Sequence, residues 1–266
     1  MSARIAITGG SGGIGSAAAE LLRSRGASVA LLDLNATDEV IACDVRDQDS
    51  VDRAIASAID RLGGLDVLVN SAGIGIPQSA GEKPDADALA VIDINLLGTW
   101  RATAAALPEL LRSRGRVINI ASGLAHVTVP LAPAYTASKR AVVGYSDSLR
   151  LEYGTELGAV TTIYPGYIKT PIHAAAADRG VALEGVVPEE PLSAAAEAIT
   201  RAALGDRLDN LATTRRGTVS YAIVDRLPRR WMRSATLAHM RRMTKKGVFG
   251  GAGLSEELGR RVSGRS

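Results

Sequence analysis

The chain contains one cysteine and has no long hydrophobic run. Cys43 cannot form a disulfide within the chain, so the simplest expectation is a reducing compartment. No apolar stretch reaches the roughly 18 residues that a membrane-spanning helix requires. The first four residues lead directly into an apolar strand pattern, which leaves no room for a cleavable signal peptide. These absences predict a cytoplasmic protein.

The composition excludes a disordered or collagen-like chain. Of the 266 residues, 46% are hydrophobic and 22% are charged, which is close to the average of globular proteins. Residues 1–200 carry 16 basic and 23 acidic side chains, a net charge of −7. Residues 201–266 carry 15 and 5, a net charge of +10. Because the body of the chain is acidic, we expect no nucleic-acid binding.

Short apolar runs rich in β-branched residues alternate with helical patterns along the chain. Continuously apolar strands are typical of a parallel sheet that is covered on both faces. The order predicts one α/β domain over about residues 1–215, a doubly wound parallel sheet with helices on both faces. The predicted strands are 5–7, 29–32, 67–69, 117–120, 160–163 and 210–214, and the predicted helices are 14–25, 49–62, 87–112, 134–156 and 192–204.

A glycine-rich segment, TGGSGGIG at residues 8–15, joins the first predicted strand to the first predicted helix. Glycine accepts positive φ and lets a phosphate approach the backbone closely. The helix N-terminus behind it offers unpaired N–H groups to an anion. A glycine cluster by itself could be a simple strand–helix turn. Its position after the first strand matches the dinucleotide-binding fingerprint.

Asp33 ends the second predicted strand, 18 residues after Gly15. This is close to the spacing of the acid that binds the adenosine ribose hydroxyls in dinucleotide-binding folds. A carboxylate there repels the additional phosphate of NADP, and no Lys or Arg lies in the glycine segment or directly after Asp33. The sequence therefore favours NAD over NADP. The alternative is an ordinary aspartate at a strand end.

Tyr135 and Lys139 are four residues apart in a predicted helix and therefore share one face of it. A phenol with a pKa near ~10 is a poor base at neutral pH. A neighbouring ammonium lowers that pKa, so the phenol can exchange a proton with an alcohol or carbonyl oxygen. Ser122 ends the fifth strand at the carboxyl edge of the sheet, where open α/β folds bind ligands.

Five motifs in this order resemble the short-chain dehydrogenase/reductase family, over about residues 4–170. The resemblance implies a single Rossmann-like domain and an oxidoreductase that transfers a hydride between NAD(H) and a secondary alcohol or ketone. It also implies a homodimer or homotetramer and no metal. The motifs are Thr8 to Gly15, Asn70-Ser71-Ala72-Gly73, Asn95, Ser122 with Tyr135-x-x-x-Lys139, and Pro165-Gly166-Tyr167-Ile168-Lys169-Thr170.

The resemblance also implies a role for each catalytic candidate. Tyr135 is the acid/base group, and Lys139 lowers its pKa and holds the nicotinamide ribose. Ser122 binds the substrate oxygen, and Asn95 holds a water that links Lys139 to solvent. The implied cofactor contacts are Gly9, Ser11, Gly13, Ile14 and Gly15 at the pyrophosphate, Asp33 at the ribose, Asp44 and Val45 at the adenine, Asn70, Ala72 and Gly73 along the cleft, and Pro165, Gly166, Ile168 and Thr170 near the carboxamide, together with Tyr135 and Lys139.

One feature departs from the family pattern. Only ten residues separate Asp33 from Asp44, where family members usually have a helix. A parallel crossover normally needs a dozen or more residues. We therefore expect the second crossover helix to be lost or reduced to a turn.

The implied substrate contacts lie in two mainly apolar segments. Residues 123–133 follow Ser122, and residues 171–191 resemble the family's mobile lid. Arg179 is the only strong base in the lid, which favours an apolar substrate of steroid, retinoid or fatty-chain type over a phosphorylated one. We expect His126 to be a wall or structural residue. The candidate substrate residues are Ser122, Leu124, His126, Tyr135 and Tyr167.

The basic extension, residues 216–266, mixes Arg and Lys with Trp, Leu and Met. It predicts a segment that packs on the acidic body or on another subunit, with weak membrane-surface contact as the alternative. For the whole chain, the second hypothesis is an NADPH-dependent ketone reductase. The third is a dinucleotide-sensing protein without activity, and it is disfavoured because Tyr135 and Lys139 are both present.

Overall fold

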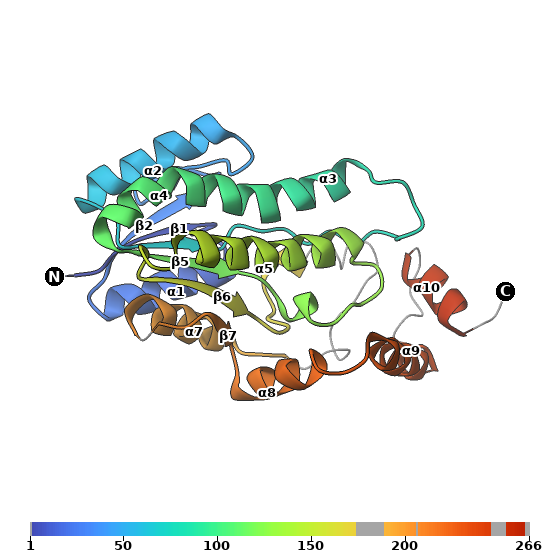
Figure 1. The fold of residues 1–266 in the computed structure, drawn as a ribbon. Coiled ribbons are helices and arrows are strands. Elements are labelled where there is room, and N and C mark those ends of the chain that lie inside the picture. Colours follow the sequence, from blue (N-terminus) through green and yellow to red (C-terminus); the bar gives the residue numbers. More distant parts are fainter. Residues whose placement is uncertain (1, 174–188, 206, 246–253, 264–266) are drawn as a thin grey trace.

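The computed structural model describes residues 2–173, 189–205, 207–245 and 254–263 (Figure 1). Its centre is a seven-stranded, all-parallel sheet in the order β3-β2-β1-β4-β5-β6-β7. This confirms the predicted doubly wound α/β fold. The strands are β1 (Arg4–Thr8), β2 (Ser28–Asp33), β3 (Val40–Ala42), β4 (Val67–Asn70), β5 (Arg116–Ile120), β6 (Ala159–Tyr164) and β7 (Asn210–Ala212).

Helices cover both faces of the sheet because its central strands are apolar on both sides (Figure 1). Ala6 of β1 packs in the core with α2 (Gln48–Leu62), α4 (Thr99–Ser113) and α5 (Pro133–Tyr153). Its neighbours in β1, Ile5 and Ile7, pack on the opposite side with α1 (Gly13–Ser24) and α7 (Leu192–Leu204). Alternate residues of one strand therefore enter two separate cores.

The connection from β2 to β3 contains no helix. Residues 34–39 form bends and extended chain, and the Thr37 hydroxyl accepts a hydrogen bond from the Val40 N–H (3.2 Å). This confirms the expected loss of the crossover helix. Residues 40–42 then pair with β2 as a short parallel strand, which the sequence pattern did not predict.

The predicted helix 87–112 is divided into three parts. The first is α3 (Ala86–Ile92), the second a π-helical turn at Asp93–Gly98, and the third α4. Gly98 lies against the body of the protein, since a Cβ there would be 2.8 Å from Val45 Cγ2. The π-helical turn buries Asn95 completely. Such turns inside α-helices occur frequently at functional sites.

In the part of the chain that the structure describes, β7 is followed by α8 (Arg215–Val224), α9 (Arg229–Lys245) and α10 (Leu254–Ser263). α9 and α10 share a small apolar cluster of Met240, Met243, Leu258 and Val262. In the ranges that the structure describes, we find no helix that combines the length and the apolar character needed to cross a membrane.

Cys43, the single cysteine, lies directly after β3 in the core between α2, α4 and the sheet. Its side chain is 3% exposed. Burial, together with the nearby Asp44 and Asp33 carboxylates, raises the pKa of its thiol to about 11. The thiol is therefore protonated at neutral pH and shielded from solvent.

Candidate active site

Many of the predicted site residues lie at or just after the carboxyl ends of six neighbouring strands, β3, β2, β1, β4, β5 and β6. Because all strands run parallel, these ends meet at one edge of the sheet. Asp33 is the last residue of β2 and Asn70 the last of β4, whereas Ser122 comes two residues after β5. The glycine segment follows β1, and Pro165 follows β6.

The glycine segment leaves the N-terminus of α1 open. Gly12 caps the helix without a side-chain hydrogen bond, and the first turn contains no acidic residue. Gly9 has φ of +64°, and a Cβ there would be 2.7 Å from the Ala72 Cα. A Cβ on Gly13 would be 2.9 Å from Thr170 Cγ2. The unpaired amides of α1 thus lie beside Ala72 and Thr170, and this arrangement fits a dinucleotide pyrophosphate.

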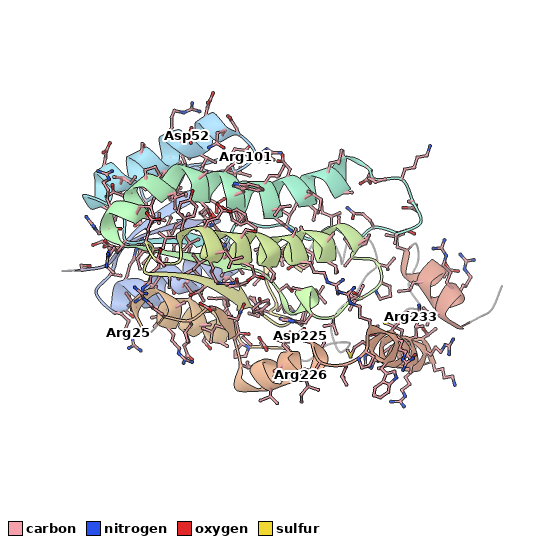
Figure 2. All side chains as sticks on the ribbon, in the orientation of Figure 1. Arg25, Asp52, Arg101, Asp225, Arg226 and Arg233 are labelled. Atoms are coloured by element: carbon pink, nitrogen blue, oxygen red, sulfur yellow. The ribbon has the colours of Figure 1, made fainter. Side chains whose placement is uncertain are left out.

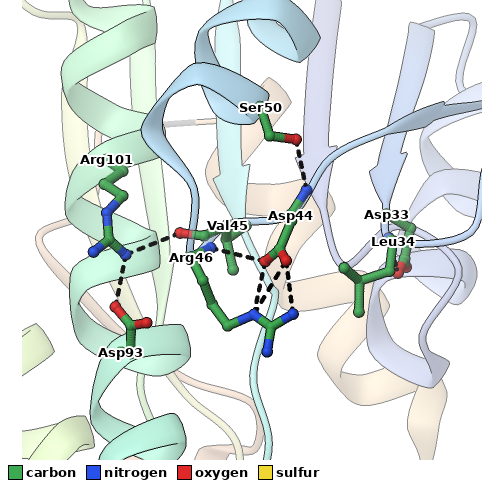
Figure 3. A network of polar contacts seen from close by, with 8 residues as sticks. All are labelled: Asp33, Leu34, Asp44, Val45, Arg46, Ser50, Asp93 and Arg101. Atoms are coloured by element: carbon green, nitrogen blue, oxygen red, sulfur yellow. Dashed lines mark hydrogen bonds and ion pairs between the residues drawn. The ribbon is translucent and has the colours of Figure 1, made fainter.

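Asp33 is held in place by the glycine segment. The Ser11 N–H donates to Asp33 Oδ2 (2.9 Å), and the Leu34 N–H donates to Asp33 Oδ1 (2.8 Å). Figure 3 shows Asp33 and Leu34 on one side of Asp44. The carboxylate is therefore fixed at the end of β2 beside the proposed pyrophosphate site.

Asp44 forms an ion pair that the sequence pattern did not reveal (Figure 3). The Arg46 guanidinium donates to both carboxylate oxygens, at 2.7 Å from Nη2 to Oδ2 and 2.9 Å from Nε to Oδ1. This hydrogen bonding lowers the pKa of Asp44. On the other side, Arg101 Nη1 donates to the Val45 carbonyl (3.1 Å) and pairs with Asp93 (2.8 Å). Arg46 thus brings a positive charge to the predicted adenine end of the site.

Tyr135, Lys139 and Ser122 come together between α5 and the end of β5. The Ser122 hydroxyl lies near enough to the Tyr135 phenol to influence the pKa of that phenol. The Lys139 ammonium lies 5.7 Å from the centre of the Tyr135 ring and donates to the Ile120 carbonyl (2.9 Å). Burial raises the pKa of Tyr135, whereas the sequence predicted that Lys139 would lower it, and the nearby Ser122 hydroxyl opposes that rise. Burial also lowers the pKa of Lys139 to about 8.

Asn95 connects the π-helical turn to the tyrosine helix. Its amide nitrogen donates to Ser138 Oγ (3.1 Å), and Ser138 Oγ donates to the Tyr135 carbonyl (2.8 Å). The Asn95 side chain also exchanges two hydrogen bonds with the Ile74 backbone. A Cβ on Gly73 would lie 3.2 Å from Asn95 Oδ1 and 3.5 Å from Lys139 Nζ. Because Gly73 has no side chain, Asn95 and Lys139 can lie close to the backbone that follows β4.

The Asn70 side chain lies within the core. Its Nδ2 donates to Thr103 Oγ1 (2.9 Å) and Asn119 Oδ1 (2.8 Å), and Asn119 Nδ2 donates to Ser146 Oγ (2.9 Å). This buried chain joins β4 and β5 to α4 and α5. Asn70 consequently holds together the elements that carry Asn95 and Tyr135.

Glu190 anchors the loop after β6, and sequence reasoning did not identify it. Its carboxylate accepts from the Gly166 N–H (3.0 Å) and from the hydroxyls of Thr213 and Thr214. The Glu190 N–H donates to the Tyr167 carbonyl (2.7 Å). One carboxylate thus ties the predicted carboxamide loop, in which Ile168 is buried, to the end of β7. No local motif indicates contacts over such sequence separations.

The predicted substrate residues occupy different surroundings. The Leu124 N–H donates to Ser122 Oγ (3.2 Å), so Leu124 lies in the 3-10 turn that follows Ser122. His126 instead contacts the C-terminal extension: its Nδ1 is 2.8 Å from Asp225 Oδ1, and its ring stacks on Tyr221 at 4.6 Å. Tyr167 forms an isolated bridge with Glu189. Most of the predicted lid, residues 174–188, lies outside the described residues.

Comparisons with known proteins give a consistent result. A family model described as short chain dehydrogenase matches residues 3–179. Oxidoreductase UcpA of Escherichia coli (strain K12) is 35% identical over 219 residues, which cover 76% of this chain and 82% of that protein. D-beta-hydroxybutyrate dehydrogenase of Rhizobium meliloti is 31% identical over 206 residues, covering 69% of this chain and 80% of that protein.

Solved structures agree with this result. A short chain dehydrogenase from Burkholderia cenocepacia, solved in complex with NADP, has a TM-score of 0.73 at 25% identity and covers 89% of this chain and 98% of its own. The aldohexose dehydrogenase of Thermoplasma acidophilum has a TM-score of 0.69 at 28% identity, covering 80% and 93%.

Proposed function

Since the chain belongs to the short-chain dehydrogenase/reductase family and is an NAD(P)-dependent oxidoreductase acting on CH–OH groups, we propose that Tyr135 is its acid/base group. We further propose that it uses NAD(H) and that its substrate is an apolar secondary alcohol or ketone. The observation that carries the catalytic proposal is that the partly buried Tyr135 lies beside the buried Ser122 and Lys139.

The proton moves through Tyr135. Burial raises the pKa of its phenol, so the phenol is protonated at neutral pH and can donate to a ketone oxygen. The Lys139 ammonium beside the ring then stabilises the phenolate that remains. Ser122, whose hydroxyl lies beside the phenol, is placed to donate to the same substrate oxygen. In alcohol oxidation the phenolate accepts the proton instead.

Asn95 supports this proton transfer as a positioning residue. Its side-chain oxygen and nitrogen are occupied by Ile74 and Ser138. Its backbone carbonyl accepts a hydrogen bond from the Thr99 hydroxyl (2.9 Å). A carbonyl oxygen has a second lone pair. We therefore propose that the backbone of Asn95, rather than its amide, holds the water that links Lys139 to solvent.

The open N-terminus of α1, Asp33 and Thr170 would hold the dinucleotide. When bound, its nicotinamide ring supplies the hydride acceptor or donor. Two features support NAD: the Asp33 carboxylate is fixed beside Ser11, and the Arg46 guanidinium is already paired with Asp44. Arg46 also favours the second candidate, an NADPH-dependent reductase, because a 2′-phosphate could compete with Asp44 for it.

The apolar substrate proposal rests on the segment after Ser122 and on Ile172. Leu124 of this segment is partly buried, and so is Ile172, which lies near the Tyr135 ring because a Cβ on Gly75 would be 3.6 Å from Ile172 Cγ1 and 3.5 Å from the ring. Such apolar side chains favour a substrate that can be desolvated. A panel of apolar and polar secondary alcohols, assayed by NADH formation, measures this preference.

The catalytic proposal is tested with Tyr135→Phe. Turnover should fall by more than 100-fold because the acid/base hydroxyl is lost, whereas NADH affinity, measured by fluorescence titration, should stay within twofold. Tyr145→Phe removes a hydroxyl from the same helix and should retain activity. Retained turnover in Tyr135→Phe would mean that another group performs the proton transfer.

A further inference from the structure

A cavity lies beside the candidate active site, between the segment after Ser122 and the C-terminal helices. Its volume is about 1050 Å³. Residues 125–131, one side of α5, the end of β7, and α8 and α9 surround it. Ser122, Tyr135 and Lys139 are not among its described lining residues. We propose that this cavity binds an amphipathic anion, namely a long-chain carboxylate, at a site separate from the catalytic centre.

The interior of the cavity is apolar. Both the body of the protein and the C-terminal helices contribute aliphatic side chains, most of them partly buried. A hydrocarbon chain placed between them would remove apolar surface from water on both sides. The aliphatic residues include Val129, Leu131 and Val143 from the body, and Val224, Leu227 and Met232 from the C-terminal helices.

The rim of the cavity is cationic. Arg140, Arg229 and Arg233 line it and are exposed. Arg229 and Arg233 are one turn apart on α9, and neither guanidinium group forms a hydrogen bond or ion pair with a side chain or backbone group in the described ranges. Figure 2 shows Arg233 on α9 and Asp225 near α8. The two α9 guanidinium groups are therefore available to a carboxylate.

The acidic groups of the cavity do not neutralise this rim. Asp147 is paired with Arg150, and Asp225 is paired with His126. Arg140 uses only part of its guanidinium, donating from Nε to the Ala125 carbonyl (3.0 Å) and from Nη2 to Thr128 Oγ1 (2.9 Å). The free charge is thus positive, and it lies at the edge of an apolar interior. That distribution matches a ligand with a hydrocarbon tail and an anionic head.

Contacts of His126 join two walls of the cavity, the segment after Ser122 and α8. The His126–Asp225 contact and the ring stack of His126 on Tyr221 connect the segment after Ser122 to α8. His126 also lies 4.5 Å from the Tyr164 ring, and Tyr164 donates to Asn210 Oδ1 (2.7 Å). This aromatic group keeps α8 in place and gives the cavity a formed wall without a ligand.

The test is calorimetric titration of the full-length protein with dodecanoate, kept below its micelle concentration, and with dodecanol. We expect saturable binding of dodecanoate and at least tenfold weaker binding of dodecanol. The double variant Arg229→Gln/Arg233→Gln should bind dodecanoate at least tenfold more weakly. The control Arg230→Gln/Arg242→Gln, which makes the same change in charge on α9 outside the cavity, should bind within twofold of wild type.

Three results would overturn the proposal. They are no binding of dodecanoate to the wild type, equal loss of affinity in the two double variants, and binding confined to phosphatidylglycerol vesicles. The last result would assign the basic helices to a lipid surface instead. Val224→Trp, which fills the cavity, should weaken both dodecanoate and dodecanol. NADH titration of each variant checks the fold and keeps this test independent of the proposed catalytic function.

Discussion

At the scale of single residues, burial shifts the pKa values of Tyr135 and Lys139 in opposite directions. Burial disfavours the charged form of each, so it raises the pKa of the phenol and lowers that of the ammonium. With a pKa of about 8, Lys139 is mostly charged at pH 7. The site therefore contains a neutral acid beside a cation, as ketone reduction requires.

Lys139 should make stability depend on pH in the protein without cofactor. The unfolded chain keeps the Lys139 proton up to about pH 10.4, whereas the folded chain releases it at about 8. Stability from this group thus rises with pH between these values. Relative to Lys139→Met, the wild type should gain about 1–3 kcal/mol from pH 7.5 to 10.

Urea unfolding of both proteins across this pH range measures the gain. The paired comparison cancels the contributions of other titrating groups. A constant difference between wild type and Lys139→Met would contradict a depressed Lys139 pKa.

Asp33 should determine the choice of cofactor. Asp33→Ala removes the negative charge that we propose faces the ribose, so NADH affinity should fall and the NADH to NADPH affinity ratio should drop about tenfold, equivalent to about 1.4 kcal/mol. Fluorescence titration with both cofactors gives the ratio. Asp38→Ala makes the same change in charge on the exposed 34–39 connection and should leave the ratio unchanged. An unchanged affinity ratio in Asp33→Ala would mean that Asp33 positions the Ser11 backbone and does not select the cofactor.

At the scale of elements, the π-helical turn and its glycine decide how closely α4 approaches the end of β3. Gly98→Ala would bring a Cβ within 2.8 Å of Val45 Cγ2. We expect a loss of about 1–3 kcal/mol in the free energy of unfolding from overpacking. Gly144→Ala in α5 meets nothing within 4 Å and should instead stabilise by about 0.5–1 kcal/mol.

Urea unfolding of the two alanine variants measures both effects. If Gly98→Ala is as stable as Gly144→Ala, α4 can move away from Val45 without cost. The pair therefore separates a packing effect from the general preference of helices for alanine over glycine.

Helices and strands could be predicted where the hydrophobic pattern of the sequence extended over many residues. Helix α7 has the predicted bounds 192–204, and the missing crossover helix followed from the ten residues between Asp33 and Asp44. Strand β3 was missed because three residues carry no periodicity of their own. It exists because its backbone pairs with β2. The π-helical turn was likewise hidden, since apolar spacing over 87–112 is compatible with one continuous helix.

Contacts within the candidate site were likewise predictable only where the two residues are close in the sequence. Tyr135 and Lys139 could be predicted because they are four residues apart on one helix. The pairing of Glu190 with Gly166 and Thr214, and of His126 with Asp225, spans 24 to 99 residues. Only the folded chain brings these groups together, so no local pattern could indicate them.

At the scale of the whole molecule, apolar side chains remain exposed on the paired helices α3–α5. Leu89 is 64% exposed, Trp100 55% and Leu151 88%. The rings of Trp100 and Tyr145 lie 5.0 Å apart and so join α4 to α5. Exposed apolar surface of this kind is consistent with the predicted homodimer or homotetramer.

Light scattering coupled to gel filtration tests this prediction. The wild type should have the mass of a dimer or tetramer, and Trp100→Glu should reduce it by disrupting the paired helices. Trp231→Glu, at an exposed position on α9, should keep the wild-type mass. A monomeric wild type would contradict the prediction.

The protected thiol of Cys43 has a practical consequence for spectroscopy. A maleimide reagent needs an accessible thiolate, and Cys43 offers neither access nor ionisation at neutral pH. A cysteine introduced at an exposed position, such as Arg230 on α9, would be the one reactive thiol among the described residues. A fluorescent or spin label can therefore be attached to the C-terminal helices without removing the natural cysteine, so changes in the surroundings of these helices can be followed as ligands bind.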